Sequence, residues 1–298
     1  MVGINNRDKR IEIAKETLEI LDNGFYINSE GDKINFKDDL DYAISNSTLY
    51  KPDMPEGLVN AVNDMLKLNK DRECKIEVTG ETTITASLRL INQDGIHETV
   101  CLNFASAKNP GGGFLTGSQA QEESLARSSG LYPCISQMSE MYEYNRNNRT
   151  CLYSDYMIHS PKVPFIRYDS GKLMDKPVLI SVITAPAVNA GVVMQGDKED
   201  QDKIGEVMIE RIRKILAVAA VNKSRAIVLG AFGCGVFKNK PEDVAGYFER
   251  VLLKEGYKVL FDKIVFAVYE KSEDKRNFNP FNKVFGGVNN EYKRMEFV

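Results

Sequence analysis

The spacing of apolar residues changes character near residue 70. Before it, apolar positions recur every three or four residues over 7–21 and again over 55–68, with a short hairpin expected between these helices at 25–36. After it, runs of apolar, largely β-branched residues alternate with helical patterns. We therefore predict an N-terminal helical layer over residues 1–70, packed on an α/β core that spans residues 71–298 and includes a C-terminal tail.

The core reads as strands interleaved with helices. The predicted strands lie at 75–79, 99–104, 152–159, 178–184, 225–230 and 261–269, and the last of them is expected to close the sheet. Helices are predicted to begin at 82 or 83, at 121, at 197 and at 241, the first ending at 90 and the third at 219. Segment 38–49 fits neither the helix nor the strand pattern, and 277–298 is a tail without an assigned structure. This alternation predicts a three-layer α/β sandwich.

Composition narrows the function classes. The chain has 298 residues, of which 43% are hydrophobic, enough for one large domain or two smaller ones. Its net charge of −3 provides no general attraction to nucleic acid or to an anionic membrane, so we expect no membrane partner and no direct sequence-specific nucleic-acid binding. The five cysteines form no CxxC pair, and the N-terminus has no apolar signal segment. These features predict a cytoplasmic protein without disulfides or a zinc site.

Two glycine-rich segments, 106–113 and 230–235, each follow a predicted strand. The first contains three consecutive glycines, Gly111, Gly112 and Gly113, which are costly to order and so indicate positive φ angles or a ligand lying on the backbone. Ligands of α/β sheets bind beyond the carboxyl ends of the strands, and converging N–H groups suit a diphosphate. The alternative is a pair of tight turns. Neither segment has the residue order of a Walker loop or of a dinucleotide fingerprint.

Two adjacent carboxylates, Glu122 and Glu123, follow the first glycine segment. On a helix they project about 100° apart, so at most one is expected to face a given bond. Without the glycines they would be interpreted as a solvated first turn that favours the helix dipole. Together with the glycines they predict a pocket that carries one working carboxylate at its rim.

These residues carry a family resemblance. The sequence Asn-Phe-Ala-x-Ala-x-Asn-Pro at 103–110, then Gly-Gly-Gly, seven residues, and Gln-Glu-Glu resembles the signature of the bacterial-type poly(ADP-ribose) glycohydrolases of the macrodomain superfamily. The resemblance implies a mixed central sheet and a reaction that needs no metal or other cofactor. It also implies that Glu123 is the catalytic acid, that Glu122 hydrogen-bonds the bound riboses, and that 230–237 embraces the diphosphate.

Other candidate substrate-binding residues follow from the same segments. They are Asn103, Asn109, Gly111, Gly112, Gly113 and Gln121 around the first loop, and Gly233, Cys234, Gly235, Val236 and Phe237 in the second. Asn103 and Asn109 are expected to hold ribose hydroxyls or to shape the loop, and Gln121 to fix Glu123 or the ribose. Phe237 packs either on the ligand or in the core. Cys234, with no histidine near it in sequence, is interpreted as a small loop residue and not as a nucleophile.

The chemistry suits a single carboxyl group. Cleaving a ribose–ribose glycosidic bond requires a proton for the leaving oxygen, and the resulting carboxylate can then deprotonate the attacking water. The pKa of this group would have to be raised by burial or by nearby negative charge. His97 and His159 are far apart in sequence and are interpreted as surface or strand residues, not as metal ligands.

Three functional hypotheses follow. The first is a hydrolase that removes ADP-ribose, mainly from the ends of the ADP-ribose polymer. The second is a non-catalytic ADP-ribose-binding module that uses the same loops. The third keeps hydrolysis but acts on mono-ADP-ribosylated protein or nucleic acid, or on O-acetyl-ADP-ribose. In each case the partner is the ADP-ribose polymer or an ADP-ribosylated macromolecule.

Overall fold

The protein, described by a computed structural model over residues 6–287, is built on a seven-stranded mixed sheet. The strands are β3 (Thr48–Tyr50), β4 (Lys75–Thr79), β5 (Thr99–Phe104), β6 (Met157–Arg167), β7 (Leu173–Ala185), β8 (Ala226–Leu229) and β9 (Lys263–Ala267). Their order is β3-β6-β7-β5-β8-β9-β4. The β3–β6 and β6–β7 pairs are antiparallel and the other four pairs are parallel. A separate hairpin joins β1 (Phe25–Ile27) to β2 (Lys33–Asn35).

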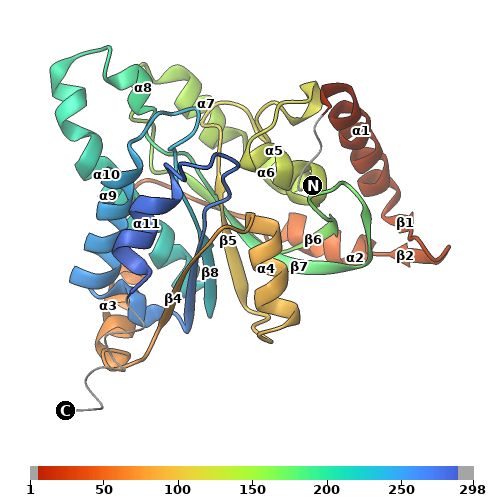
Figure 1. Cartoon of the computed structure of the whole chain (residues 1–298), viewed down its shortest axis with the longest axis horizontal. Coiled ribbons are helices and arrows are strands. Elements are labelled where there is room, and N and C mark those ends of the chain that lie inside the picture. Colours follow the sequence, from red (N-terminus) through yellow and green to blue (C-terminus); the bar gives the residue numbers. More distant parts are fainter. Residues whose placement is uncertain (1–5, 288–298) are drawn as a thin grey trace.

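Helices cover both faces of this sheet (Figure 1). They are α1 (Arg7–Asn23), α2 (Lys37–Ser45), α3 (Glu56–Leu68), α4 (Thr83–Asn92), α5 (Gln121–Ser128), α6 (Leu131–Ser136), α7 (Ser139–Asn147), α8 (Ala190–Val193), α9 (Lys198–Val221), α10 (Pro241–Glu249) and α11 (Phe278–Phe285). Helices α3, α9, α10 and α11 lie on one side, and α2, α4, α5 and α6 on the other (Figure 1). The predicted three-layer sandwich with a mixed sheet is confirmed. None of the helices within residues 6–287 combines the length and apolar character needed to cross a bilayer.

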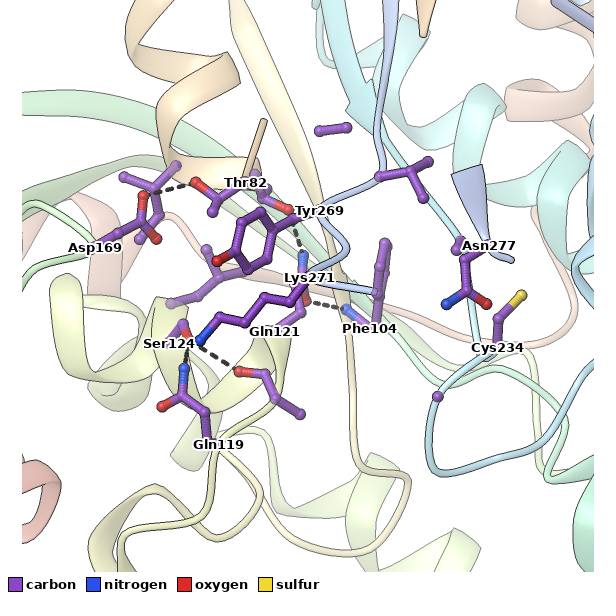
Figure 2. A pocket seen from close by; sticks show the side chains of 18 of the residues that line it. Thr82, Phe104, Gln119, Gln121, Ser124, Asp169, Cys234, Tyr269, Lys271 and Asn277 are labelled. Carbon is purple, nitrogen blue, oxygen red and sulfur yellow. Dashed lines mark hydrogen bonds between the residues drawn. The ribbon is translucent and has the colours of Figure 1, made fainter. Parts of the chain in front are cut away.

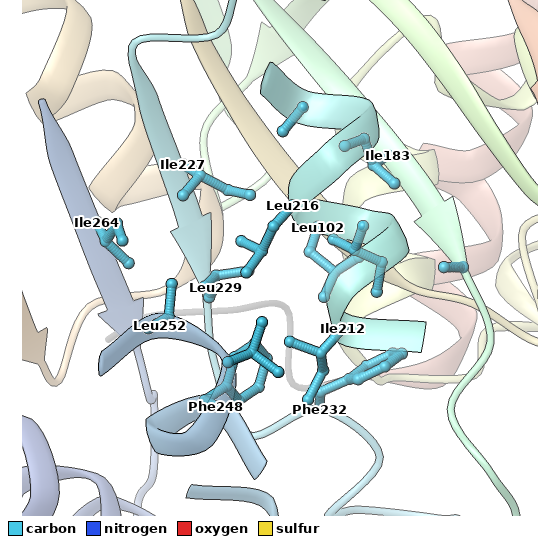
Figure 3. Close-up of a cluster of buried hydrophobic side chains, with 14 of the residues drawn as sticks. Leu102, Ile183, Ile212, Leu216, Ile227, Leu229, Phe232, Phe248, Leu252 and Ile264 are labelled. Carbon is cyan, nitrogen blue, oxygen red and sulfur yellow. The ribbon is translucent and has the colours of Figure 1, made fainter. Parts of the chain in front are cut away.

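The strands alternate their side chains between two cores. In β5, Val100 and Leu102 join the core under α9 and α10, while Cys101 joins the core under α4 and α5. Figure 3 shows the first of these cores, where Leu102 and strand residues from β7, β8 and β9 meet Leu216 of α9 and Phe248 of α10. Both faces of the central strands are therefore buried, which explains their continuous apolar sequences.

The sheet topology places the two glycine segments side by side. Strands β5 and β8 are parallel neighbours in register, with Val100 opposite Ile227 and Cys101 opposite Val228. Each strand leads at its carboxyl end into a glycine-rich segment, so the two segments emerge at the same edge of the sheet. Two segments that are far apart in the sequence therefore lie next to each other and form one surface.

Most predicted elements are found, with instructive exceptions. The hairpin at 25–36 is confirmed, and α4 begins at Thr83 with the Thr82 hydroxyl accepting from Thr85 N at 3.1 Å. The ambiguous segment 38–49 contains α2 and the start of β3. The prediction that 261–269 closes the sheet is wrong, because β9 pairs with β4 and β4 forms the edge.

Two strand boundaries also differ from the prediction. β6 begins at Met157 and not at 152, because residues 151–156 form a turn and irregular backbone, and it continues to Arg167. β7 begins earlier than predicted, at Leu173. The added β6 residues pair mainly with the predicted part of β7, and Arg167 pairs with Leu173, so the two strands form one long hairpin with two register shifts. Residues 163–167 of β6 are all buried, so their sequence shows no alternation of apolar and polar side chains.

Residues from both ends of the chain join the core. Although β3 precedes residue 70, it is a strand of the central sheet, while the division at residue 70 itself stays a prediction. The predicted tail begins with α11, whose Phe281 and Phe285 are fully buried against β9. The rest of that tail, 288–298, lies outside the described residues.

Candidate functional site

The two glycine segments enclose one cavity of about 450 Å³, called here the loop cavity. The predicted residues that line it are Asn109, Gly112, Gly113, Gln121, Glu122 and Glu123 from one side and Gly233, Gly235, Val236 and Phe237 from the other. The expectation that both segments border a common pocket, with the carboxylates beside them, is therefore met by the geometry.

The first loop needs its glycines for two different reasons. Gly111 and Gly112 have φ angles of +71° and +59°, in the left-handed region that favours glycine. At Gly112 a Cβ atom would also overlap Glu123 Oε1 and lie 3.1 Å from Glu122 Oε2. The bare backbone thus lets both carboxyl groups approach the loop. This convergence differs from the expectation that at most one would face a given point, because glutamate side chains are long enough to bend together from adjacent helix positions.

The two carboxyl groups are held differently. Glu123 Oε1 accepts a hydrogen bond from Gly113 N at 3.0 Å, while Oε2 is buried and has no hydrogen-bond partner among the described residues. Glu122 Oε2 accepts from Ser106 N at 2.6 Å, and its Oε1 lies 3.4 Å from Asn103 Nδ2. Glu122 therefore uses both oxygens to hold the loop and the end of β5, whereas Glu123, which also lines the cavity, keeps one buried oxygen without a partner among the described residues.

Helix α5 carries these carboxyl groups and is fixed at both ends. At its start, Gln121 Oε1 accepts from Phe104 N at 2.8 Å and Gln121 Nε2 donates to Leu102 O at 2.7 Å, so the side chain locks the helix onto the end of β5. These bonds go to the strand and not to Glu123, which differs from one of the roles expected of Gln121. At its end, the Thr17 hydroxyl of α1 donates to Arg127 O at 2.8 Å.

Helix α1 also holds the loop between the glycines and α5. Arg7 Nε donates to Thr116 O at 2.9 Å, and Arg10 Nε donates to Gly117 O at 2.7 Å. Gly117 has a φ of +76°, and a Cβ there would lie 2.7 Å from Arg7 O. The N-terminal helix therefore fixes the loop from outside the cavity.

The second loop turns tightly at Gly233, which has a φ of +75°. A Cβ at this position would lie 2.5 Å from Ala187 Cβ, and Asn239 Nδ2 donates to Gly233 O at 3.1 Å and to Val188 O at 2.7 Å. Beyond the turn, Val236 is 78% exposed, while the ring of Phe237 packs 5.8 Å from that of Tyr153. The loop thus presents apolar side chains at the cavity rim.

Three predicted residues do not line the loop cavity. Asn103 is fully buried behind it, where Nδ2 also contacts Thr184 Oγ1 at 3.2 Å, so it positions Glu122. Gly111 is buried within the turn. Cys234 faces the neighbouring cavity, and burial raises the pKa of its thiol to about 12, which keeps it a thiol in line with the interpretation as a loop residue.

A second cavity of about 420 Å³, called here the side cavity, adjoins the first. The two share five lining residues: Phe104, Ala120, Gln121, Ala231 and Gly235. Figure 2 shows Tyr269 and Lys271 lying across the side cavity, with Thr82 and Asp169 at one end and Asn277 and Cys234 at the other. Asp169 Oδ2 accepts from the Thr82 hydroxyl at 2.6 Å. Together the cavities form one two-part cleft.

Within residues 6–287, no three histidine, cysteine, aspartate or glutamate side chains are grouped so as to hold a metal ion. His159 lies in β6 and His97 just before β5, as surface or strand residues were expected to lie. All five cysteines are free.

Comparison with known proteins identifies the family to which the chain belongs. The sequence model of the family described as microbial-type PARG, catalytic domain, matches residues 14–168, more than half of the chain. The chain belongs to the microbial-type PARG family. The matched region includes most of α1, the first glycine loop and α5 with both carboxylates.

Solved structures agree with this assignment. Poly(ADP-ribose) glycohydrolase from Thermomonospora curvata, bound to the inhibitor ADP-HPD, is 39% identical, with a TM-score of 0.83 over 93% of this chain and 99% of that chain. The Deinococcus radiodurans enzyme in complex with ADP-ribose is 38% identical, with a TM-score of 0.76 over 84% of this chain and 98% of that one. No curated protein matches the chain. This PARG is accordingly an enzyme of the glycosidase class.

Glu122 has an unusual protonation equilibrium in this PARG. Its pKa is raised from 4.5 to about 8, mainly by burial and in part by the charge of neighbouring Glu123, although the hydrogen bond from Ser106 N opposes the rise. At neutral pH the folded protein therefore holds Glu122 largely protonated.

This shift predicts how stability changes with pH. Between about pH 4.5 and 8 an unfolded chain loses the Glu122 proton while the folded chain keeps it, so the free energy of unfolding contributed by this group falls as pH rises. Relative to a Glu122→Gln variant, which has no proton to lose, the native protein should lose about 1.4 kcal/mol per pH unit across that window. Urea unfolding from pH 5 to 7.5 measures the difference.

A Glu143→Gln variant, at an exposed position of α7, controls for the change of side chain. If the difference in unfolding free energy between the native protein and Glu122→Gln is the same at every pH, Glu122 titrates as an ordinary carboxyl and the neutral-Glu122 account fails.

Several site residues lie outside the predicted set. Ser106 anchors Glu122 through its backbone N–H, Ala187 packs against Gly233, and Asn239 holds the second loop. Ser106 begins the predicted glycine segment 106–113 but was not singled out within it, and Ala187 follows closely after β7, which ends at the cleft. Asn239 had no such signal, because its bond to Val188 joins segments 51 residues apart in the sequence.

Proposed function

We propose that this protein hydrolyses the ribose–ribose glycosidic bonds of poly(ADP-ribose), mainly at chain ends, with Glu123 as the general acid and base. One observation carries the proposal. In a cavity bordered by two glycine loops, Glu123 has one carboxyl oxygen held by Gly113 N and the other buried without a hydrogen-bond partner among the described residues. An oxygen placed in this way is free to hold and deliver a proton.

The two-part cleft matches the two halves of an ADP-ribose unit. The loop cavity provides glycine backbone at Gly112, Gly113, Gly233 and Gly235, which suits a diphosphate and the ribose beyond it. The side cavity provides the aromatic ring of Tyr269 and polar groups such as Asp169, which suit the adenosine half. The solved relatives were captured with ADP-ribose and with the inhibitor ADP-HPD, which supports the same ligand class here.

The reaction would proceed in two proton transfers on one residue. As the bond between C1″ and the leaving oxygen breaks, the Glu123 carboxyl donates its proton to that oxygen, and positive charge develops at C1″. The Glu123 carboxylate then takes a proton from the water that adds to C1″. The residue ends protonated, as it began.

Neighbouring groups would position Glu123 and the ribose for these proton transfers. The hydrogen bond from Gly113 N fixes the Glu123 carboxyl relative to the loop. Glu122, largely neutral and locked by Ser106 N and Asn103, would present its remaining hydrogen-bonding capacity to the ribose hydroxyls. Phe237 at the rim would pack on the ribose.

Paired measurements separate this function from its alternatives. Calorimetry should show that ADP-ribose binds at one site, and incubation with poly(ADP-ribose) should release free ADP-ribose from the first minutes, before shorter oligomers accumulate. Binding without release would indicate a non-catalytic reader. Early oligomers would indicate internal cleavage. Faster turnover of mono-ADP-ribosylated protein or O-acetyl-ADP-ribose than of the polymer would shift the substrate assignment.

A further inference from the structure

A third cavity, of about 420 Å³, lies away from the cleft. His97 and Glu98, just before β5, and Ser224, just before β8, help to line it. Since the catalytic cleft lies beyond the opposite ends of these two strands, this cavity opens toward the other edge of the sheet. We call it the His159 groove, after the buried β6 residue among those that line it.

Two buried polar residues line the groove, and one of them, His159, has a ring nitrogen that the fold leaves without a partner. His159 is 4% exposed and Ser224 is 7% exposed. His159 Nε2 is buried, and within residues 6–287 it makes no hydrogen bond. A buried polar group without a partner is uncommon and costly in a folded protein. His159 also lines a cavity large enough for a small molecule, so a ligand bound in the groove could supply the partner that the fold does not.

The walls of the groove favour a negatively charged ligand. Lys162 and Lys223 both line it, and among the described residues neither has a carboxylate partner. Lys162 lies at a bulge in β6, where its N–H donates to the Ser181 hydroxyl at 3.2 Å and its ammonium lies 5.7 Å from the centre of the Tyr42 ring. The groove is thus lined by two lysines and two histidines.

Glu98 is the one carboxylate among the lining residues, and it lies 3.9 Å from the Arg225 guanidinium. The ionisable groups facing His159 across the groove are therefore Tyr42 of α2, His97 and Glu98 before β5, Lys162 of β6 and Lys223 after α9. Their balance of charge is positive. Both lysines that line the groove have a left-handed backbone, with φ angles of +49° at Lys162 and +62° at Lys223.

We propose that the His159 groove binds a small phosphate-type oxyanion, contacted by Lys162, Lys223 and the His159 imidazole. This site is separate from the cleft and does not depend on the function proposed for it. Burial lowers the pKa of His159 to about 4 in the folded protein. A bound anion favours the charged imidazolium, so binding should raise that pKa and should tighten as pH falls.

The chain has two histidines, so the imidazole signals in an NMR spectrum are simple to assign, with a His97→Gln variant identifying His159. The probe is inorganic phosphate, added with saturating ADP-ribose so that the cleft is occupied. We expect the titration midpoint of His159 to rise by about one pH unit, which corresponds to about tenfold tighter binding to the protonated form.

A double variant, Lys162→Asn and Lys223→Asn, removes both cations with a residue that tolerates left-handed backbone. Lys275→Asn, at another left-handed lysine outside the groove, is the matched control. The double variant should lose the phosphate-dependent shift and the control should keep it. Calorimetric titration with phosphate at pH 6 and 7 compares the phosphate affinities of the double variant and the control without exposing either protein to low pH. A His159 signal that does not respond to phosphate, or that responds equally in the double variant, overturns the proposal.

Discussion

Replacing Glu123 by glutamine is expected to abolish release of ADP-ribose from the polymer, with kcat falling by about 10²- to 10⁴-fold. Glutamine preserves the shape of the side chain and can still accept the hydrogen bond from Gly113 N, but it has no carboxyl proton to deliver to the leaving oxygen. The affinity for ADP-ribose should stay within about tenfold of the native value, because the loops that hold the diphosphate are unchanged. Single-turnover cleavage and calorimetry measure the two quantities separately.

Glu122→Gln is the matched comparison for this experiment, since the two residues are adjacent on α5 and converge on the same glycine. Glutamine at 122 keeps an acceptor for Ser106 N, so we expect a smaller loss of kcat than at 123. If Glu123→Gln retains turnover while Glu122→Gln loses it, the acid is Glu122 and the assignment of roles is reversed.

The second large effect is expected at Gly112. A Gly112→Ala substitution introduces a methyl group that overlaps Glu123 Oε1 and crowds Glu122 Oε2, at a backbone φ of +59° that alanine disfavours. Both carboxyl groups must move, so turnover should fall by at least about 10²-fold, in line with the cost of misplacing catalytic groups by about 1 Å. Cleavage kinetics measure the loss of turnover, and thermal unfolding measures the loss of stability caused by the strained backbone.

Gly57→Ala is the control for this change. Gly57 lies in α3, where an added Cβ would meet no atom within 4 Å, and its backbone is not left-handed. Alanine there should leave activity unchanged and should stabilise the helix by about 0.5 to 1 kcal/mol. Native turnover in Gly112→Ala would show that the carboxyl groups do not need their close approach to this loop.

The sequence predicted the cleft better than it predicted the sheet. Each glycine segment follows an apolar strand, and parallel strands bring such segments to one edge, so the convergence of Gly112 and Gly233 could be inferred from local patterns. Strand order could not be inferred, because the pairing of β4 with β9 depends on contacts between residues distant in sequence.

Side-chain roles within the cleft were partly inaccessible to sequence. Gln121 was expected to serve Glu123 or the ribose, yet its amide spans the backbone of β5, an arrangement that exists only once α5 has docked. Asn103 ends a strand that leads to the cavity, but its position in the sheet turns the side chain toward Glu122 behind the loop. In both cases the residue type indicated a role near the site, but tertiary packing decided where the side chain points.

The account as a whole is tested most directly by a crystal structure of this protein with ADP-ribose bound. We expect the diphosphate to lie between the loops at Gly112–Gly113 and Gly233–Phe237, with the Glu123 carboxyl within hydrogen-bond distance of the oxygen on C1″. A structure that places C1″ beyond the reach of Glu123, or the diphosphate outside these two loops, would contradict it.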